Sequence, residues 1–225
     1  MKNYKSIIFD CDGVILNSNK IKTESFKKIL IQFNRNAVNE FLNYHKNNGG
    51  VSRYIKIDYF LTNILPKYSN SLENKEYTLS SLLENYSNEC KKSLYNSEVA
   101  YDLDKLKEIT CNIPWTIVSG GDQKELRDVF EYKNLISYFD GGIYGSPEKK
   151  IDILKREINR GYINYPALFL GDSKLDHTVA KSLNIDFLFV TNWTDFKGYQ
   201  DYCKCNSIDT ISSVSELINI FKELQ

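Results

Sequence analysis

One short strand-like run near the start of the chain is separated from all the others by about 80 residues of helical pattern. The run YKSIIFD, residues 4–10, is apolar and β-rich, which is typical of strands buried in a parallel sheet. Between residues 19 and 94 the sequence predicts helices, in the stretches IKTESFKKILIQF, VSRYIKIDYFLTNIL and YTLSSLLENYSNECKKSL, joined by breaks rich in Asn and Gly. We expect no buried strand in this part of the chain.

Strand-like and helical segments alternate after residue 101. The runs WTIVS, ALFLGD and DFLFV predict strands, helices are predicted at LDKLKEI, QKELRDVFEY, KIDILKREI and LDHTVAKSL, and YFDGGIYGSP is rich in turn residues. Such alternation indicates right-handed βαβ units and a parallel sheet. The sequence thus predicts an α/β fold, with a doubly wound, Rossmann-like core of residues 1–16 and 101–225 and an inserted α-helical domain of residues 17–100.

The charge of the chain is balanced, with 29 basic and 29 acidic side chains. No overall field attracts it to nucleic acid or to an anionic membrane, so we expect neither as a partner. We find no charged-then-apolar leader, and no apolar run approaches the roughly 18 residues that a membrane span needs. Five scattered cysteines fit reduced thiols better than a disulfide framework. We expect a cytoplasmic protein.

Polar residues follow four of the predicted strands or their loops. They are Asp10 and Asp12, Ser119 with Gly120 and Gly121, a lysine in GSPEKK, and Asp172 with Asp176. Ligands of open α/β sheets bind outside the carboxyl ends of the strands, so these residues could converge on one rim. Each alone also has a structural explanation, because an Asp after a strand can cap a helix and Ser-Gly-Gly can form a tight loop. Their combination is what points to chemistry.

This combination suits phosphoryl transfer. Carboxylates clustered at a strand end raise one another's pKa unless a cation neutralises them. Oxygen ligands without His or Cys favour Mg²⁺, which uses one or two carboxylates, several waters and a phosphate oxygen. Ser119, the amides of Gly120 and Gly121, and the lysine would hold the remaining phosphate oxygens. We therefore expect Mg²⁺ as the cofactor.

Four motifs stand in order along the chain, namely DCDGVILNS, IVSGG, GSPEKK and GDSKLD. In these motifs the chain resembles the haloacid dehalogenase (HAD) superfamily, in its phosphatase branch with a helical cap inserted after the first strand, the arrangement that includes phosphoglycolate phosphatase and β-phosphoglucomutase. The resemblance covers nearly the whole chain. It implies that residues 17–100, called the cap below, close over the active site and choose the substrate.

The resemblance also implies a role for each motif residue. Asp10 would be the nucleophile that forms an aspartyl-phosphate, and Asp12 would be the general acid and base. Ser119 and Gly120 would bind the transferring phosphoryl group. The dehalogenase branch has no acid/base Asp two residues after the first, so Asp12 favours phosphate chemistry over halide displacement.

The implied Mg²⁺ ligands are the side chains of Asp10 and Asp172 and the backbone carbonyl of Asp12. Asp176 would lie just outside these ligands or bind a metal-bound water. The phosphate-binding lysine is either Lys149 or Lys150, because the proline that follows it in many relatives is absent here. The spacing after Gly-Ser-Pro favours Lys150.

The cap stretch HKNNGGVSRYIKIDYF places a Gly-Gly break directly before a predicted helix. Its candidate substrate-contacting residues are Arg53, Ser52, Lys56 and His45, since helix N-termini bind anions and Arg can add a bidentate contact. The alternative is a helix capped by Ser52 with ordinary surface charge.

Taken together, these patterns predict a Mg²⁺-dependent phosphatase that hydrolyses a small phosphorylated metabolite through an aspartyl-phosphate, as a monomer or weak homo-oligomer. A phosphomutase of the β-phosphoglucomutase type would share all the core residues and remains open. A receiver-like or non-catalytic phosphate-binding module is a more remote alternative, since a receiver's phosphorylated carboxylate follows a middle strand of the chain.

Overall fold

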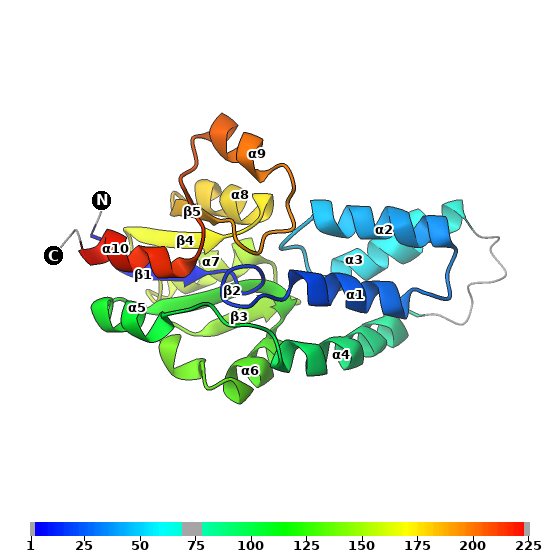
Figure 1. Ribbon diagram of the computed structural model, residues 1–225, viewed down its shortest axis with the longest axis horizontal. Coiled ribbons are helices and arrows are strands. Elements are labelled where there is room, and N and C mark those ends of the chain that lie inside the picture. The colour runs from blue at the N-terminus through cyan, green and yellow to red at the C-terminus, as the bar shows by residue number, and fades with distance from the viewer. Residues whose placement is uncertain (1–2, 69–77, 223–225) are drawn as a thin grey trace.

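The computed structural model describes residues 3–68 and 78–222, in which six strands form one sheet with every neighbouring pair parallel. Across the sheet the order is β3 (Ile143–Ser146), β2 (Trp115–Asp122), β1 (Ser6–Phe9), β4 (Ala167–Gly171), β5 (Asp186–Val190) and β6 (Thr210–Ile211). β1 lies inside the sheet, where Ile7 pairs with Trp115 and Leu168. The predicted α/β fold with a parallel sheet and an inserted helical part is confirmed (Figure 1).

Helices cover both faces of the sheet. One face carries α5 (Leu103–Ile109), α6 (Gln123–Tyr132) and α10 (Leu217–Lys222), the other α7 (Lys150–Asn159) and α8 (Lys174–Ser182), and α9 (Tyr199–Asn206) precedes β6. Alternate residues of β1 point to the two faces, so Ile7 and Phe9 enter one apolar core and Ile8 the other. β1 is therefore buried on both sides, and its carboxyl end is fixed between two rigid layers.

The cap is built from α1 (Asn19–Ile29), α2 (Arg35–Asn47), α3 (Arg53–Tyr59) and α4 (Leu79–Tyr95), with short π-helical (Phe60–Ile64) and 3₁₀ (Leu65–Lys67) turns after α3. These helices lie to one side of the sheet (Figure 1). Aromatic side chains pack between them and continue the apolar core of one sheet face. The Phe26 ring lies 5.1 Å from that of Phe41 and 4.1 Å from that of Tyr86 between centroids.

The chain leaves the core and re-enters it through two adjacent segments. The Asn17 amide donates to the Glu98 carbonyl at 2.9 Å, and the Ala100 amide donates to the Ile15 carbonyl at 2.9 Å. Because both crossings lie here, we propose the division expected from the sequence, with the cap beginning at residue 17 and ending at residue 100.

The expectations differ from the structure at two elements. The turn-rich segment YFDGGIYGSP contains β3, a strand at the edge of the sheet. The glycines of this segment are typical of turns, so its sequence did not predict a strand. A stretch expected to be a break between helices forms α2, because Asn34 accepts a hydrogen bond from the Asn36 amide and Phe41 anchors a buried face. The sequence patterns predict no element after residue 190, where the structure has α9, β6 and α10.

Within residues 3–68 and 78–222, none of the helices combines the length and the apolar character needed to cross a bilayer.

Candidate active site

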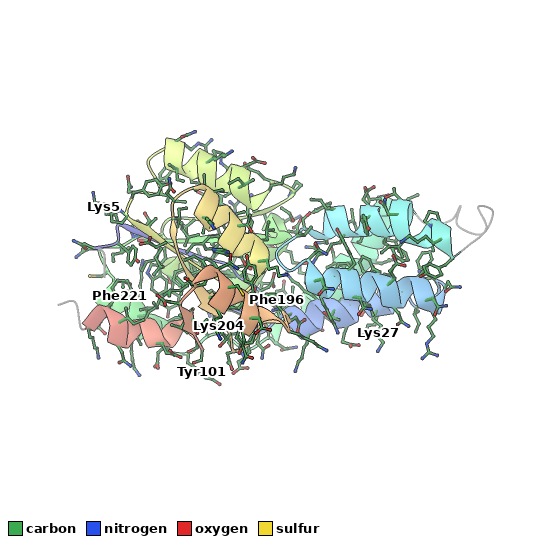
Figure 2. All side chains as sticks on the ribbon, turned by 90° about the horizontal axis from the view of Figure 1, so that it is seen from above. Lys5, Lys27, Tyr101, Phe196, Lys204 and Phe221 are labelled. Atoms are coloured by element: carbon green, nitrogen blue, oxygen red, sulfur yellow. The ribbon has the colours of Figure 1, made fainter. Side chains whose placement is uncertain are left out.

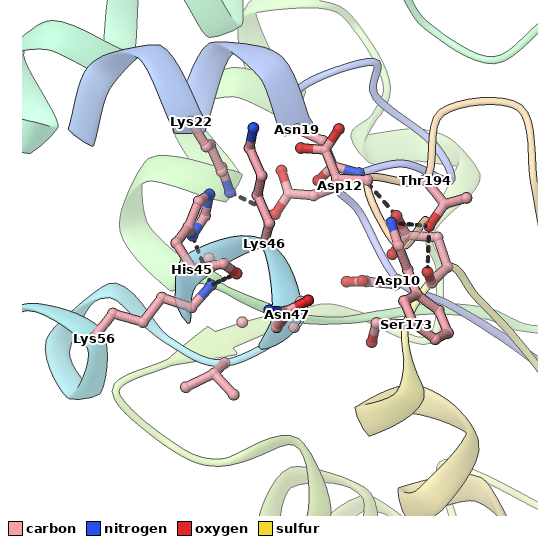
Figure 3. A pocket seen from close by; sticks show the side chains of 18 of the residues that line it. Asp10, Asp12, Asn19, Lys22, His45, Lys46, Asn47, Lys56, Ser173 and Thr194 are labelled. Carbon is pink, nitrogen blue, oxygen red and sulfur yellow. Dashed lines mark hydrogen bonds and ion pairs between the residues drawn. The ribbon is translucent and has the colours of Figure 1, made fainter. Parts of the chain in front are cut away.

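A pocket of about 790 Å³, part of it open to solvent, lies between the carboxyl ends of the strands and the cap. Asp10, Asp12 and Asp172 line it from the core, and Lys56 and His45 line it from the cap (Figure 3). The two carboxylates that follow β1 therefore do meet the carboxylate that follows β4, as the parallel topology predicts.

Asp10 follows β1 directly and is 2% exposed. Its Oδ1 accepts hydrogen bonds from the Cys11 amide at 2.7 Å and from Lys150 Nζ at 2.8 Å. Both contacts use the same oxygen, so among the described residues Oδ2 is the one left for another partner. Cys11 itself is buried in the apolar core, as alternation along an extended chain requires.

Asp12 is held by two donors that the first cap helix and the segment before it supply. Ser18 Oγ donates to Oδ1 at 2.6 Å, and Lys22 Nζ contacts Oδ2 at 2.5 Å. Burial alone would raise the pKa of Asp12, but the charge and hydrogen bond of Lys22, with help from Ser18, outweigh it and lower the pKa below its usual value. Asp12 is thus an oriented carboxylate in this arrangement.

Gly13 makes the close approach of the first loop to Asp172 possible. Its φ is +79°, and a Cβ there would lie 2.1 Å from Asp172 Oδ2. Any other residue would both strain the backbone and collide with a candidate metal ligand.

Three buried carboxylates gather at the base of the pocket. Asp10, Asp172 and Asp176 each offer an oxygen within 4.8 Å of the others. Burial, with Asp10 and Asp176 nearby, raises the pKa of Asp172 well above its usual value. Burial likewise raises the pKa of Asp10 to about 7, although Lys150 counteracts it. The cluster carries more negative charge than its surroundings neutralise.

This cluster fits Mg²⁺. Its donors are carboxylate oxygens of residues at one rim of the sheet, without His or Cys, and the repulsion between them calls for a cation. Asn19 Nδ2 donates to Asp172 Oδ2 at 2.8 Å, and Thr194 Oγ1 donates to the Asp172 carbonyl at 2.7 Å, so this carboxylate is fixed by its neighbours.

Lys150 and Lys149 have different surroundings. Lys150 is 3% exposed, and its Nζ lies 2.8 Å from Asp10 Oδ1 and 2.6 Å from Asp176 Oδ1. Lys149 is exposed at the position preceding α7. Asp176 is fixed further by Ser173 Oγ, which donates to its Oδ2 at 2.6 Å. Lys150 is thus the lysine next to the proposed nucleophile.

Ser119 and Gly120 lie in the second half of β2, the strand that pairs with β1. Ser119 is fully buried, and its Oγ accepts a hydrogen bond from the Gly121 amide at 2.9 Å. Gly120 and Gly121 line the pocket, whereas Ser119 does not. A Cβ on Gly120 would lie 2.0 Å from the Gly50 carbonyl oxygen, so the absence of a side chain lets the cap approach the core here.

Three of the four candidate cap residues line the pocket, namely Arg53, Lys56 and His45. Ser52 does not line it, and its Oγ instead accepts a hydrogen bond from the Ile55 amide at 3.4 Å as the N-cap of α3. This is the helix-capping alternative, so we leave Ser52 out of the proposed substrate contacts.

A buried ion pair joins the cap to the core. Arg53 of α3 contacts Glu125 of α6 at 2.9 Å, with the side chains 5% and 9% exposed. Next to it, Tyr54 Oη donates to Asp122 Oδ2 at 2.6 Å. Arg53 is therefore already bound to a core carboxylate, which its sequence context did not indicate.

Glu125→Gln is expected to lower the free energy of unfolding by about 3 kcal/mol, because it leaves the Arg53 guanidinium buried without its anion. The matched control is Asp128→Asn. Its pair with Lys91 also joins α6 to the cap, but the two side chains are 35% and 50% exposed, so a loss of under about 1 kcal/mol is expected. Urea unfolding of both variants checks this. Equal losses of unfolding free energy would show that the buried pair contributes no more to stability than the exposed pair.

Several pocket residues were missed from the sequence. They are Asn19, Lys22, Phe26, Lys46, Asn47, Tyr86, Lys174, Thr194, Asp195 and Phe196. Phe196 belongs to a loop after β5 that reaches the junction of core and cap (Figure 2). For Lys22 a usable signal existed, because it lies one turn into the helix that directly follows the first motif.

A family model described as haloacid dehalogenase-like hydrolase matches residues 7–190 of the chain. None of the curated proteins compared with the chain matches it.

Solved structures share the fold at low sequence identity. A haloacid dehalogenase-like family hydrolase from Streptococcus pneumoniae is similar with a TM-score of 0.69 and 21% identity, over 98% of this chain and 100% of that one. β-Phosphoglucomutase from Clostridium difficile has a TM-score of 0.69 and 17% identity, over 98% of each chain. CbbY from Rhodobacter sphaeroides, in complex with phosphate, has a TM-score of 0.65 and 16% identity, over 95% of this chain and 96% of that one.

Proposed function

The chain belongs to the haloacid dehalogenase-like hydrolase family, and on that premise we propose that it is a Mg²⁺-dependent phosphatase that hydrolyses a small phosphorylated metabolite through an aspartyl-phosphate. One observation carries the proposal. Asp10, Asp12 and Asp172 line one pocket, with Lys150 Nζ 2.8 Å from Asp10.

In the first step the Asp10 carboxylate attacks phosphorus and displaces the alcohol of the substrate. Lys150 holds Oδ1 of Asp10 at 2.8 Å, which orients the carboxylate and leaves Oδ2 for the attack. Ser119 and the amide of Gly120, on the neighbouring strand β2, would bind the oxygens of the transferring group.

Asp12 would be the general acid and base. As an acid it protonates the leaving oxygen, and as a base it then takes a proton from the water that hydrolyses the aspartyl-phosphate. The contacts with Ser18 and Lys22 favour its carboxylate form, which the second step requires. The proton that Asp12 takes from this water is the one that it donates to the leaving oxygen in the next turnover.

Mg²⁺ would be held by the side chains of Asp10 and Asp172 and by the Asp12 carbonyl, while Asp176 would lie just outside these ligands or bind a metal-bound water. When bound, it neutralises charge on the phosphoryl oxygens. The phosphate bound in the solved CbbY structure is consistent with a phosphoryl-binding site in this fold.

The purified protein is expected to hydrolyse p-nitrophenyl phosphate with Mg²⁺ and to lose at least about 100-fold in rate with EDTA, because Mg²⁺ supplies several kcal/mol of charge stabilisation. Added Mg²⁺ should restore the rate. Undiminished hydrolysis without metal, or no hydrolysis of this ester and a panel of phosphorylated metabolites, would contradict the proposal. Conversion of a hexose 1-phosphate into its isomer in the presence of a bisphosphate activator, without phosphate release, would indicate a mutase instead.

A further inference from the structure

Lys56 is a buried cation of the pocket with no carboxylate at ion-pair distance among residues 3–68 and 78–222. It lies on α3 and is 4% exposed. Its Nζ donates to His45 Nδ1 at 2.9 Å and to the His45 carbonyl at 3.4 Å. An ammonium group has more donors than these two acceptors use.

The buried Arg53 and Lys150 and the partly buried Lys22 have carboxylates of their own. Lys22 pairs with Asp12, Lys150 pairs with Asp10 and Asp176, and Arg53 pairs with Glu125. Each of these cations balances a charge that belongs to the protein. The positive charge of Lys56 has no such counterpart in the described part of the chain.

His45 holds Lys56 in place without neutralising it. Since Lys56 donates to Nδ1, the ring is a neutral imidazole whose Nε2–H donates to Thr23 Oγ1 at 3.1 Å. Thr23 Oγ1 in turn lies 3.5 Å from Asp195 Oδ2. Burial, with Lys56 nearby, lowers the pKa of His45 well below its usual value, which agrees with a neutral ring.

Leaving this ammonium uncompensated costs free energy. Burial first, and then the positive charge of Lys22, lower the pKa of Lys56 to about 7. The negative charges of Asp12 and Asp172 raise the pKa of Lys56, but by less than burial and the nearby positive charge lower it. An anion bound next to Nζ would restore the full charge and offset the cost of burying it.

Lys56 comes from the cap, whereas the groups that would hold the transferring phosphoryl group come from the sheet and the start of α7. Figure 3 shows Lys56 and His45 on the cap side of the pocket, while Asp10 and Ser173 come from the strand ends. A small molecule could thus place its phosphate at the strand ends and a second group against the cap.

We propose that the substrate carries a second anionic group, a carboxylate or a second phosphate, which binds Lys56 at the cap wall of the pocket. This inference rests on the proposed phosphatase function. It assigns Lys56 as the residue that distinguishes doubly anionic phosphate esters from esters with one anionic group, with His45 positioning it.

The test compares kcat/KM within matched substrate pairs. One pair is 3-phosphoglycerate and glycerol 3-phosphate, which differ in a carboxylate, and the other is glucose 1,6-bisphosphate and glucose 1-phosphate, which differ in a phosphate. We expect at least one anionic member to be preferred by about 10- to 100-fold, chiefly through KM, as a charge-assisted hydrogen bond in a buried site allows. The pair that shows the preference identifies the anionic group.

Lys56→Met is expected to reduce that preference to about 2-fold or less. Lys27→Met removes one positive charge from the exposed surface of α1 and should keep the preference (Figure 2). Equal kcat/KM within both wild-type pairs, or an equal loss for all four esters in Lys56→Met, would overturn the inference. The wild-type comparison decides even if Lys56→Met does not fold. Failure to hydrolyse any of the four esters or p-nitrophenyl phosphate would instead refute the phosphatase function.

Discussion

Asp10→Asn is expected to lower the turnover of any substrate by at least about 10⁴-fold, because an amide cannot serve as the nucleophile that forms the aspartyl-phosphate. The fold should survive, since Asn has nearly the same shape and Lys150 keeps its contact with Asp176 at 2.6 Å. Steady-state kinetics with Mg²⁺, together with circular dichroism, measure both expectations.

The direction in which Asp10→Asn changes the stability of the metal-free protein can also be predicted. Burial and the nearby carboxylates Asp176 and Asp12 raise the pKa of Asp10 to about 7, so its negative charge is unfavourable in the folded protein without metal. The unfolding temperature of metal-free Asp10→Asn should therefore equal or exceed that of the wild type at pH 8, where Asp10 is ionised.

Asp152→Asn is a suitable control, because this carboxylate is exposed on α7 and its loss should change turnover by less than about 2-fold. Mass spectrometry of the wild type during turnover adds an independent readout. A phosphorylated peptide containing Asp10 is expected, and full activity of Asp10→Asn would eliminate the covalent mechanism.

The strand-end residues could be predicted because their positions follow from topology. Asp10 and Asp172 each follow an apolar run, and parallel strands bring such ends to one rim, where both residues line the pocket. Ser119 also follows an apolar run, but it is buried within β2 and is not among the residues that line the pocket. The convergence of the two aspartates requires only that the sheet forms. Nothing about the cap is needed to place them.

The cap residues could not be predicted in the same way. Lys22 contacts Asp12 only because α1 folds back across the first motif, and Arg53 meets Glu125 only because the cap closes on α6. Sequence spacing gives the helix face of such residues but not the partner that faces them. For Lys56 the informative fact is the lack of a carboxylate nearby in the described residues, which depends on the positions of all its neighbours.

The second large effect concerns the two adjacent lysines. Lys150→Met is expected to lower kcat/KM by about 10³-fold, because it removes the cation that orients Asp10 and lies within hydrogen-bonding distance of both Asp10 and Asp176. Lys149→Met removes the same charge one residue earlier at an exposed position, so a change below about 2-fold is expected. Kinetics of the two variants under the same Mg²⁺ concentration give the comparison.

Removing one partner of a buried charge cluster also destabilises a fold, by about 3–5 kcal/mol where nothing replaces it. In Lys150→Met the carboxylates of Asp10, Asp172 and Asp176 would repel one another, and bound Mg²⁺ should recover part of the loss. Thermal unfolding with and without Mg²⁺ should therefore show a larger metal-induced stabilisation in Lys150→Met than in Lys149→Met. If Lys150→Met is unfolded even with Mg²⁺, Lys150→Gln retains a hydrogen-bond donor and replaces it in the kinetics. A large loss of activity in Lys149→Met, with normal activity in the Lys150 variants, would assign the phosphate-binding role to Lys149. In that case the burial of Lys150 beside Asp10 would not be required for the reaction.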